Sequence, residues 1–117
     1  MSTPVGPYTP IVRVGDWLIV SGQVGIVNGK LVDGGTEGQL RQALANLDAL
    51  LQSEGAGPTD VVKTTVFLRH MSDYALMNEI YTGYFEDNRP ARSAIAVAEL
   101  PVGALVEIEA WAHTGPR

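Results

Sequence analysis

Residues 104–112 restrict the possible folds more than any other stretch of the chain. Their side chains are predicted to alternate between the two faces of a strand, because neighbouring strand residues point in opposite directions. One face carries the small apolar set Val106, Ile108 and Ala110. The other face mixes carboxylates with large apolar groups, namely Leu105, Glu107, Glu109 and Trp111. A mixed face of this kind suits neither a solvent surface nor a core.

The length and composition indicate one globular domain, 1–117. The chain has 117 residues, of which 45% are hydrophobic and 18% charged, so it can bury a core. Its net charge of −5, without a Lys/Arg cluster, argues against a nucleic-acid partner. The chain has no cysteine, which excludes disulfides and thiol nucleophiles. The start of the chain does not resemble a secretion signal and no apolar run approaches membrane-spanning length, so we expect a soluble cytoplasmic protein with no membrane partner.

Glycine and proline divide the first third of the chain into two predicted hairpins. Residues 10–14 and 17–21 are joined by Gly15 and Asp16. Residues 24–27 and 30–32 are joined by Asn28 and Gly29, the dipeptide that most readily forms a type I′ turn.

Two helices and a central strand are predicted in the middle of the chain. Thr36, with Gln39 three residues later, predicts a capping box, and Gly55 is expected to end this first helix. Residues 61–68 are rich in β-branched side chains, which is typical of a central strand. Ser72 or Asp73 is expected to cap a second helix. Its apolar face would consist of Tyr74, Met77, Tyr81, Tyr84 and Phe85.

The last third is predicted to form a hairpin of residues 93–98 and 104–112, with its turn at residues 100–103. Two helices and about six strands predict an α+β fold with both helices on one face of a mixed sheet. The other face then needs a cover, which a homo-oligomer would supply.

Arg92 and Glu107 are the candidate catalytic residues. Arg92 begins an otherwise small and apolar strand, and its planar guanidinium suits bidentate capture of a carboxylate. The predicted hairpin would bring Glu107 near Arg92, where its carboxylate could orient water or transfer a proton. The structural alternative is an ion pair of Arg92 with Glu107 or Glu109.

Other polar residues give weaker signals. Tyr8 and Ser21 could line a pocket, although their positions alone favour a packing role for Tyr8 and a turn role for the Ser21 hydroxyl. His70 and His113 lack the partners of a catalytic triad or a metal site, so we predict no metal.

The sequence resembles the RidA (YjgF/YER057c) family of reactive-intermediate deaminases over nearly its whole length. The similar segments include residues 6–8, 20–23, 41–47, 60–68, 78–81 and the signature that runs from residues 90–93 to 106–110. The resemblance implies a chorismate-mutase-like fold, a homotrimer with clefts between subunits, and no cofactor. It also implies hydrolysis of enamines and imines such as 2-aminoacrylate and 2-iminopropionate to 2-keto acids and ammonia.

The resemblance also assigns roles to residues. Arg92 matches the arginine that grips the substrate carboxylate, and Glu107 matches the glutamate that orients water. Tyr8 and Ser21 match pocket residues, and Gly22 and Phe67 are expected to line the cleft.

Two alternatives remain open at the level of sequence. The first is a non-catalytic trimer that binds a 2-keto acid or an amino acid through Arg92, because a fold does not determine a function. The second is a ribonuclease, which the acidic net charge and the absence of a paired-histidine site disfavour.

Overall fold

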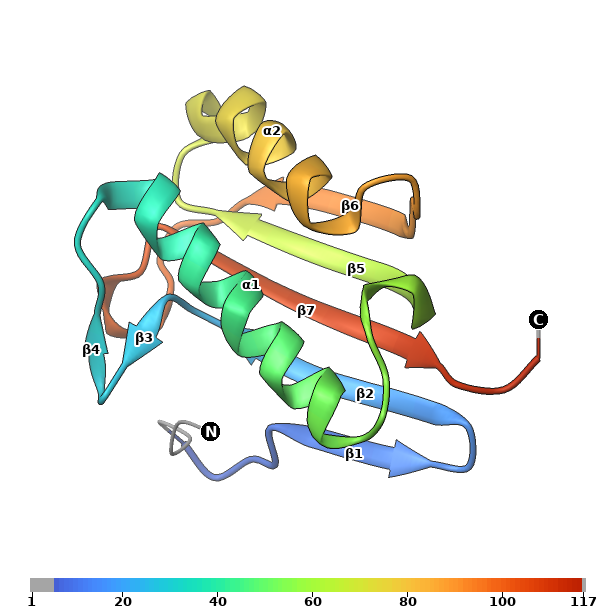
Figure 1. Ribbon diagram of the computed structural model, residues 1–117. Coiled ribbons are helices and arrows are strands. Elements are labelled where there is room, and N and C mark those ends of the chain that lie inside the picture. The colour runs from blue at the N-terminus through green and yellow to red at the C-terminus, as the bar shows by residue number, and fades with distance from the viewer. Residues whose placement is uncertain (1–5, 117) are drawn as a thin grey trace.

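The computed structural model describes residues 6–116, which form a five-stranded sheet with two helices on one face (Figure 1). The strand order is β1-β2-β7-β5-β6, and only β5 and β6 are parallel. The strands of this sheet are β1 (Ile11–Val14), β2 (Trp17–Gln23), β5 (Val61–Leu68), β6 (Ala91–Ala96) and β7 (Val106–His113). A separate ribbon contains β3 (Ile26–Val27) and β4 (Lys30–Leu31). The expected single sheet of about six strands is therefore divided into five and two.

The helices α1 (Gly35–Ser53) and α2 (Tyr74–Phe85) pack side by side on the same face of the sheet (Figure 1). The main core lies between this face and the helices, where fully buried side chains include Leu18, Leu40, Leu47, Val66, Met77 and Ile108. The predicted α+β class with both helices on one face is confirmed. None of the helices within residues 6–116 is long and apolar enough to cross a bilayer.

The opposite face of the sheet carries no helix of the described residues and is called the bare face below (Figure 1). In β7 the side chains alternate as predicted, with Val106 and Ile108 buried under the helices and Glu107 and Glu109 half-buried on the bare face. Trp111 continues the bare-face row and is 44% exposed. The strand pattern in the sequence therefore identified both faces correctly.

The predicted hairpin between the last two strands is wrong, because β5 lies between β6 and β7. The β5-α2-β6 segment is a parallel crossover, whose helix covers the sheet and places β6 at the edge. The following loop passes around the end of β5. Val97 N donates to Leu68 O at 2.8 Å, and Arg69 N donates to Leu105 O at 2.9 Å. A turn does form at Pro101–Gly103, but it joins strands that are not neighbours.

The predicted capping box at Thr36 is also wrong. Helix α1 begins earlier, after Gly34 in a left-handed conformation with φ 105°. Thr36 lies inside the helix, and its hydroxyl donates to Asp73 Oδ2 at 2.7 Å. This bond engages the Asp73 carboxylate, so Asp73 occupies the N-cap position of α2 without a side-chain capping bond. A hydrogen bond between the N-terminal ends of α1 and α2 therefore takes the place of the local caps predicted at Thr36 and Asp73.

The short turns agree with the sequence. Asn28 and Gly29 have φ values of 53° and 79°, as a type I′ turn requires. Gly15 has a φ of 58° and starts the turn between β1 and β2. Gly55 has a φ of 75° two residues after the end of α1, directly after the C-cap residue Glu54. Backbone geometry that depends on one or two residues was therefore predictable.

Candidate functional site

Glu107 lies on the bare face between Gly22 on one neighbouring strand and Phe67 on the other. Glu107 and Phe67 are directly paired residues of β7 and β5. The Glu107 carboxylate lies across Gly22, where an added Cβ would come within 2.5 Å of Oε2. The pairing of β2 with β7 shifts register between Val20 and Gln23, so Gly22 lies in a β-bulge. Glu107, Gly22 and Phe67, all expected to be site residues, therefore lie next to one another.

Burial raises the pKa of the Glu107 carboxyl, and the neighbouring charge of Glu109 raises it further. No arginine or lysine within residues 6–116 forms an ion pair with Glu107. A half-buried carboxyl without a cation beside it holds a proton to higher pH than an ordinary glutamate. The arrangement suits a group that orients water or carries a proton.

Ser21 ties the segment that contains Tyr8 to this part of the sheet. Its hydroxyl donates to Thr9 O at 2.6 Å, and its backbone N donates to Pro10 O at 2.9 Å. Tyr8, next to Thr9 in the chain, is 42% exposed. The Ser21 hydroxyl therefore holds the chain beside Tyr8, while the Tyr8 ring remains accessible.

Arg92 lies at the edge of the sheet and points toward α2. Its Nη2 donates to Tyr74 Oη at 3.1 Å, and its Nη1 contacts Met77 Sδ at 3.5 Å. Its Cζ lies 4.9 Å from the centre of the Tyr81 ring and 5.6 Å from that of Tyr74. The expected alternative of an ion pair with Glu107 or Glu109 is absent from the described residues, where Arg92 faces no carboxylate. The guanidinium is held by uncharged aromatic and thioether groups.

A buried hydrogen bond supports the ring beneath Arg92. Tyr81 Oη and Thr64 Oγ1 are 2.7 Å apart, and Thr64, the direct strand partner of Arg92, is fully buried. Burial raises the pKa of the Tyr81 hydroxyl, although the Thr64 bond and the charge of Arg92 oppose the increase. Tyr81 therefore stays neutral and fixed, which holds the surface on which the guanidinium lies.

Arg92 and Glu107 do not meet within one chain. Arg92 is level with Thr64 on the helix side of the sheet, whereas Glu107 is level with Phe67 on the bare face. Their Cα atoms are two strands apart across the sheet and three residues apart along the strand direction, which corresponds to a distance of about 14 Å. The proximity expected from the hairpin is wrong, because β5 separates the two strands.

Sequence reasoning assigned Tyr74, Met77 and Tyr81 to the apolar face of a helix and missed their contact with Arg92. A helical pattern shows which residues share a face, but not which strand they cover. Asn78, also on α2, has a buried Oδ1 with no hydrogen-bond partner among the described residues. No group of three or more His, Asp or Glu side chains within residues 6–116 could hold a metal ion.

The fold and site define an α+β protein with one helix-covered face, the half-buried Glu107 carboxylate on the bare face and Arg92 at the sheet edge. The chain belongs to the endoribonuclease L-PSP family, whose model matches residues 1–114. This is the family to which the RidA proteins belong, so the predicted resemblance is confirmed.

Three relatives illustrate the similarity. The mouse 2-iminobutanoate/2-iminopropanoate deaminase is 47% identical over 114 residues, which are 96% of this chain and 84% of the mouse protein. A RutC family protein of Pyrococcus horikoshii is 43% identical over 112 residues, covering 94% of this chain and 89% of its own. The crystal structure of RidA from an Antarctic Psychrobacter superimposes with a TM-score of 0.91 at 36% identity, covering 95% of this chain and 91% of the other.

Proposed function

We propose that this protein is a deaminase that hydrolyses reactive enamines and imines of the 2-aminoacrylate and 2-iminopropanoate type to 2-keto acids and ammonia. The observation that carries the proposal is the Arg92 guanidinium, which is oriented by two tyrosines and faces no protein carboxylate among the described residues. Full-length similarity to a 2-iminobutanoate/2-iminopropanoate deaminase supports the same activity.

Arg92 would bind the substrate carboxylate. A guanidinium offers five N–H donors in a fixed plane, and among residues 6–116 the Arg92 guanidinium donates only to Tyr74 and Met77. The remaining donors are available for a bidentate bond, which both holds and orients a planar carboxylate. An imine carbon is already electrophilic, so fixing it beside a water provides much of the rate enhancement.

Glu107 would orient that water and transfer its proton to the leaving nitrogen. Its pKa, which burial and then the charge of Glu109 raise above the ordinary glutamate value, suits a group that must both accept and release a proton. Ser21, Gly22, Phe67 and Tyr8 would form the walls around the reacting carbon. Addition of water to the C=N bond followed by loss of ammonia requires no cofactor.

A homotrimer would complete this site. Within one chain Arg92 and Glu107 lie on opposite faces of the sheet, so a cleft containing both requires the edge of one subunit to approach the bare face of the next. The bare face supports such packing, because Trp17 and Trp111 are 40% and 44% exposed and lie edge to face with ring centres 6.0 Å apart. We place the trimer in the cytoplasm, which the absence of cysteine supports.

A coupled assay tests the activity. A serine dehydratase generates the enamine, and its decay to pyruvate is followed with and without this protein. We expect faster decay, and a loss of about tenfold to a hundredfold in kcat/KM for Arg92→Ala, the size of a lost charged hydrogen bond. Arg41→Ala is the matched control, since Arg41 is exposed on α1. Decay that is unchanged by the protein, with saturable binding of pyruvate, would favour the binding trimer instead.

Complementation tests the shared site. Arg92→Ala and Glu107→Gln trimers, each with strongly reduced activity alone, are unfolded together and refolded as mixed trimers. If each cleft takes Arg92 from one subunit and Glu107 from its neighbour, some mixed clefts contain both side chains and activity returns. Mixed trimers that are no more active than the parents would contradict the arrangement.

A further inference from the structure

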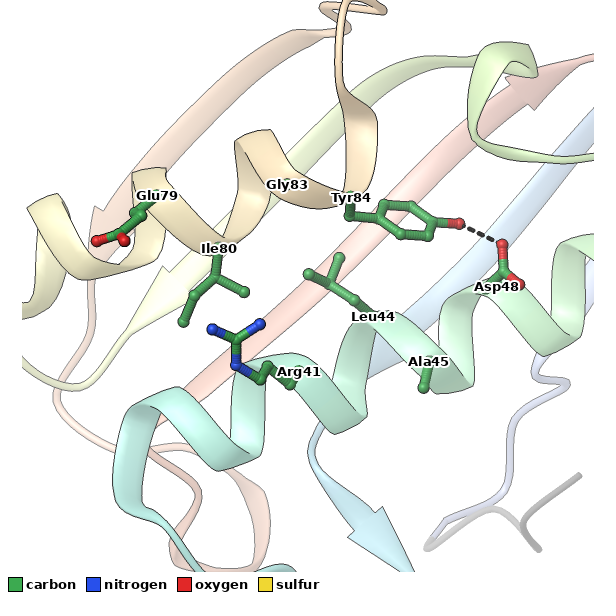
Figure 2. A pocket seen from close by; sticks show the side chains of 8 residues that line it. All are labelled: Arg41, Leu44, Ala45, Asp48, Glu79, Ile80, Gly83 and Tyr84. Atoms are coloured by element: carbon green, nitrogen blue, oxygen red, sulfur yellow. Dashed lines mark hydrogen bonds between the residues drawn. The ribbon is translucent and has the colours of Figure 1, made fainter.

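A groove on the outer surface between α1 and α2 has a volume of about 580 Å³ (Figure 2). It lies on the side of the helices away from the sheet, so it is separate from the cluster around Glu107. Its apolar floor contains Leu44 and Ile80, which also belong to the core. Figure 2 shows Arg41 and Glu79 toward one end of the groove and Asp48 with Tyr84 at the other.

Gly83 keeps the middle of the groove open. It lies inside α2, where glycine is about 1 kcal/mol less favourable than alanine. An added Cβ at Gly83 would meet no atom within 4 Å, so packing within the described residues does not require glycine there. Any larger side chain at this position would instead project into the groove that Gly83 lines.

The end that contains Arg41 and Glu79 presents one cation and one anion from different helices. Arg41 donates from Nε to Glu37 at 3.3 Å, and its two Nη groups have no acceptor among the described residues. Glu79 is exposed and has no hydrogen bond or ion pair within residues 6–116. The two Nη groups that Arg41 leaves unused, together with the Glu79 carboxylate, match the carboxylate and ammonium of an α-amino acid.

The other end presents a second anion. Tyr84 donates its hydroxyl to Asp48 Oδ1 at 2.8 Å, which leaves the other oxygen of Asp48 able to accept. Burial and the adjacent Asp48 raise the pKa of the Tyr84 hydroxyl, so it remains a donor. Glu79 and Tyr84 are five residues apart on α2, which corresponds to about 7.5 Å along the helix axis.

We propose that this groove binds a free basic α-amino acid of the lysine type. Its head group lies between Arg41 and Glu79, its methylenes cover Leu44 and Gly83, and its terminal ammonium binds Asp48. The charge agrees, since three carboxylates and one guanidinium line or adjoin the groove and leave it acidic. The proposal does not depend on the activity of the Arg92 site.

Calorimetric titration with three probes tests the proposal. L-lysine carries all three charged groups, norleucine lacks the terminal amine, and cadaverine lacks the carboxylate. We expect saturable lysine binding at least about tenfold tighter than binding of either analogue, because each lacks one charged hydrogen bond. Equal affinities, or no saturation with lysine, would overturn the proposal.

Variants locate the binding. Gly83→Leu fills the groove with a good helix former, and Glu79→Gln removes one charge without changing shape. We expect both to weaken lysine binding at least about tenfold, whereas Glu99→Gln, in the loop after β6, leaves it unchanged. Thermal unfolding confirms that each variant is folded. Arg92→Ala separates the two sites: lysine binding that disappears in this variant, or that survives both groove variants, refutes the assignment.

Discussion

The Glu107 carboxylate lies directly over the backbone of Gly22, so that an added Cβ at Gly22 would be 2.5 Å from Oε2 and 2.8 Å from the carboxyl carbon. Only glycine leaves room for the side chain in this position. The contact joins β2 to β7 at the β-bulge and sets the direction in which the carboxylate points. The placement of Glu107 therefore depends on the missing side chain of a neighbouring strand.

Replacement of Gly22 by alanine is expected to displace Glu107. We expect a loss of at least about tenfold in kcat/KM for imine hydrolysis with little loss of stability, because the atoms that would clash are the end of a flexible side chain that can move aside. Kinetics and urea unfolding measure the two effects. Gly83→Ala is the control, because its Cβ meets nothing and it should raise stability by about 0.5–1 kcal/mol. Unchanged activity in the Gly22 variant would show that the position of the carboxylate does not matter.

Glu107→Gln is expected to stabilise the protein at neutral pH while removing activity. Burial raises the pKa of Glu107 in the folded state above its value in the unfolded state. At pH values between these two pKa values, the folded state therefore binds more protons than the unfolded state. Stability from this group is present below the unfolded pKa and decreases as pH rises through the folded pKa. The advantage of the glutamine variant should therefore grow with pH across this window. Urea unfolding at several pH values measures it, and an advantage that is constant with pH would contradict the assignment.

The buried pair of Thr64 and Tyr81 is expected to behave as a unit. Thr64→Val leaves the Tyr81 hydroxyl buried without a hydrogen-bond partner and should lower the free energy of unfolding by about 1–3 kcal/mol. Tyr81→Phe leaves the Thr64 hydroxyl without a partner and should have a similar cost. The double variant should cost less than the sum of the two, because both polar groups are then removed. A double-mutant cycle by chemical unfolding measures the coupling, and strictly additive costs would argue against a hydrogen bond.

Arg92→Lys is expected to retain the positive charge but not the function. Lysine lacks the planar fork that stacks on Tyr81 and binds a carboxylate through two parallel bonds. We expect KM for the imine to rise about tenfold or more, with a smaller change in kcat. Steady-state kinetics beside Arg92→Ala measures the difference. A lysine variant with the KM of the original protein would mean that charge alone binds the substrate.

Much of the local structure could be predicted from the residues themselves. Asn28 and Gly29 predicted their turn, and the alternation around Val106 and Ile108 predicted both faces of β7, because these patterns depend on residues adjacent in the chain. The predicted cap at Thr36 was wrong because the outcome depended on a residue distant in the sequence. The Thr36 hydroxyl was engaged by Asp73, which is 37 residues away in the sequence. Local rules do not indicate which of several partners a polar side chain will choose.

The pattern of residue types was enough to predict one strand with a carboxylate on a mixed face, two amphipathic helices and an arginine at the start of another strand. That β5 separates Arg92 from Glu107, and that the two side chains lie on opposite faces of the sheet, became clear only from the arrangement of the strands. The physical reason is that alternation along a strand is local, whereas strand order follows from how the α2 crossover packs on the sheet. Side-chain type can identify the residues of a site, but only the packing of distant segments decides which of them meet.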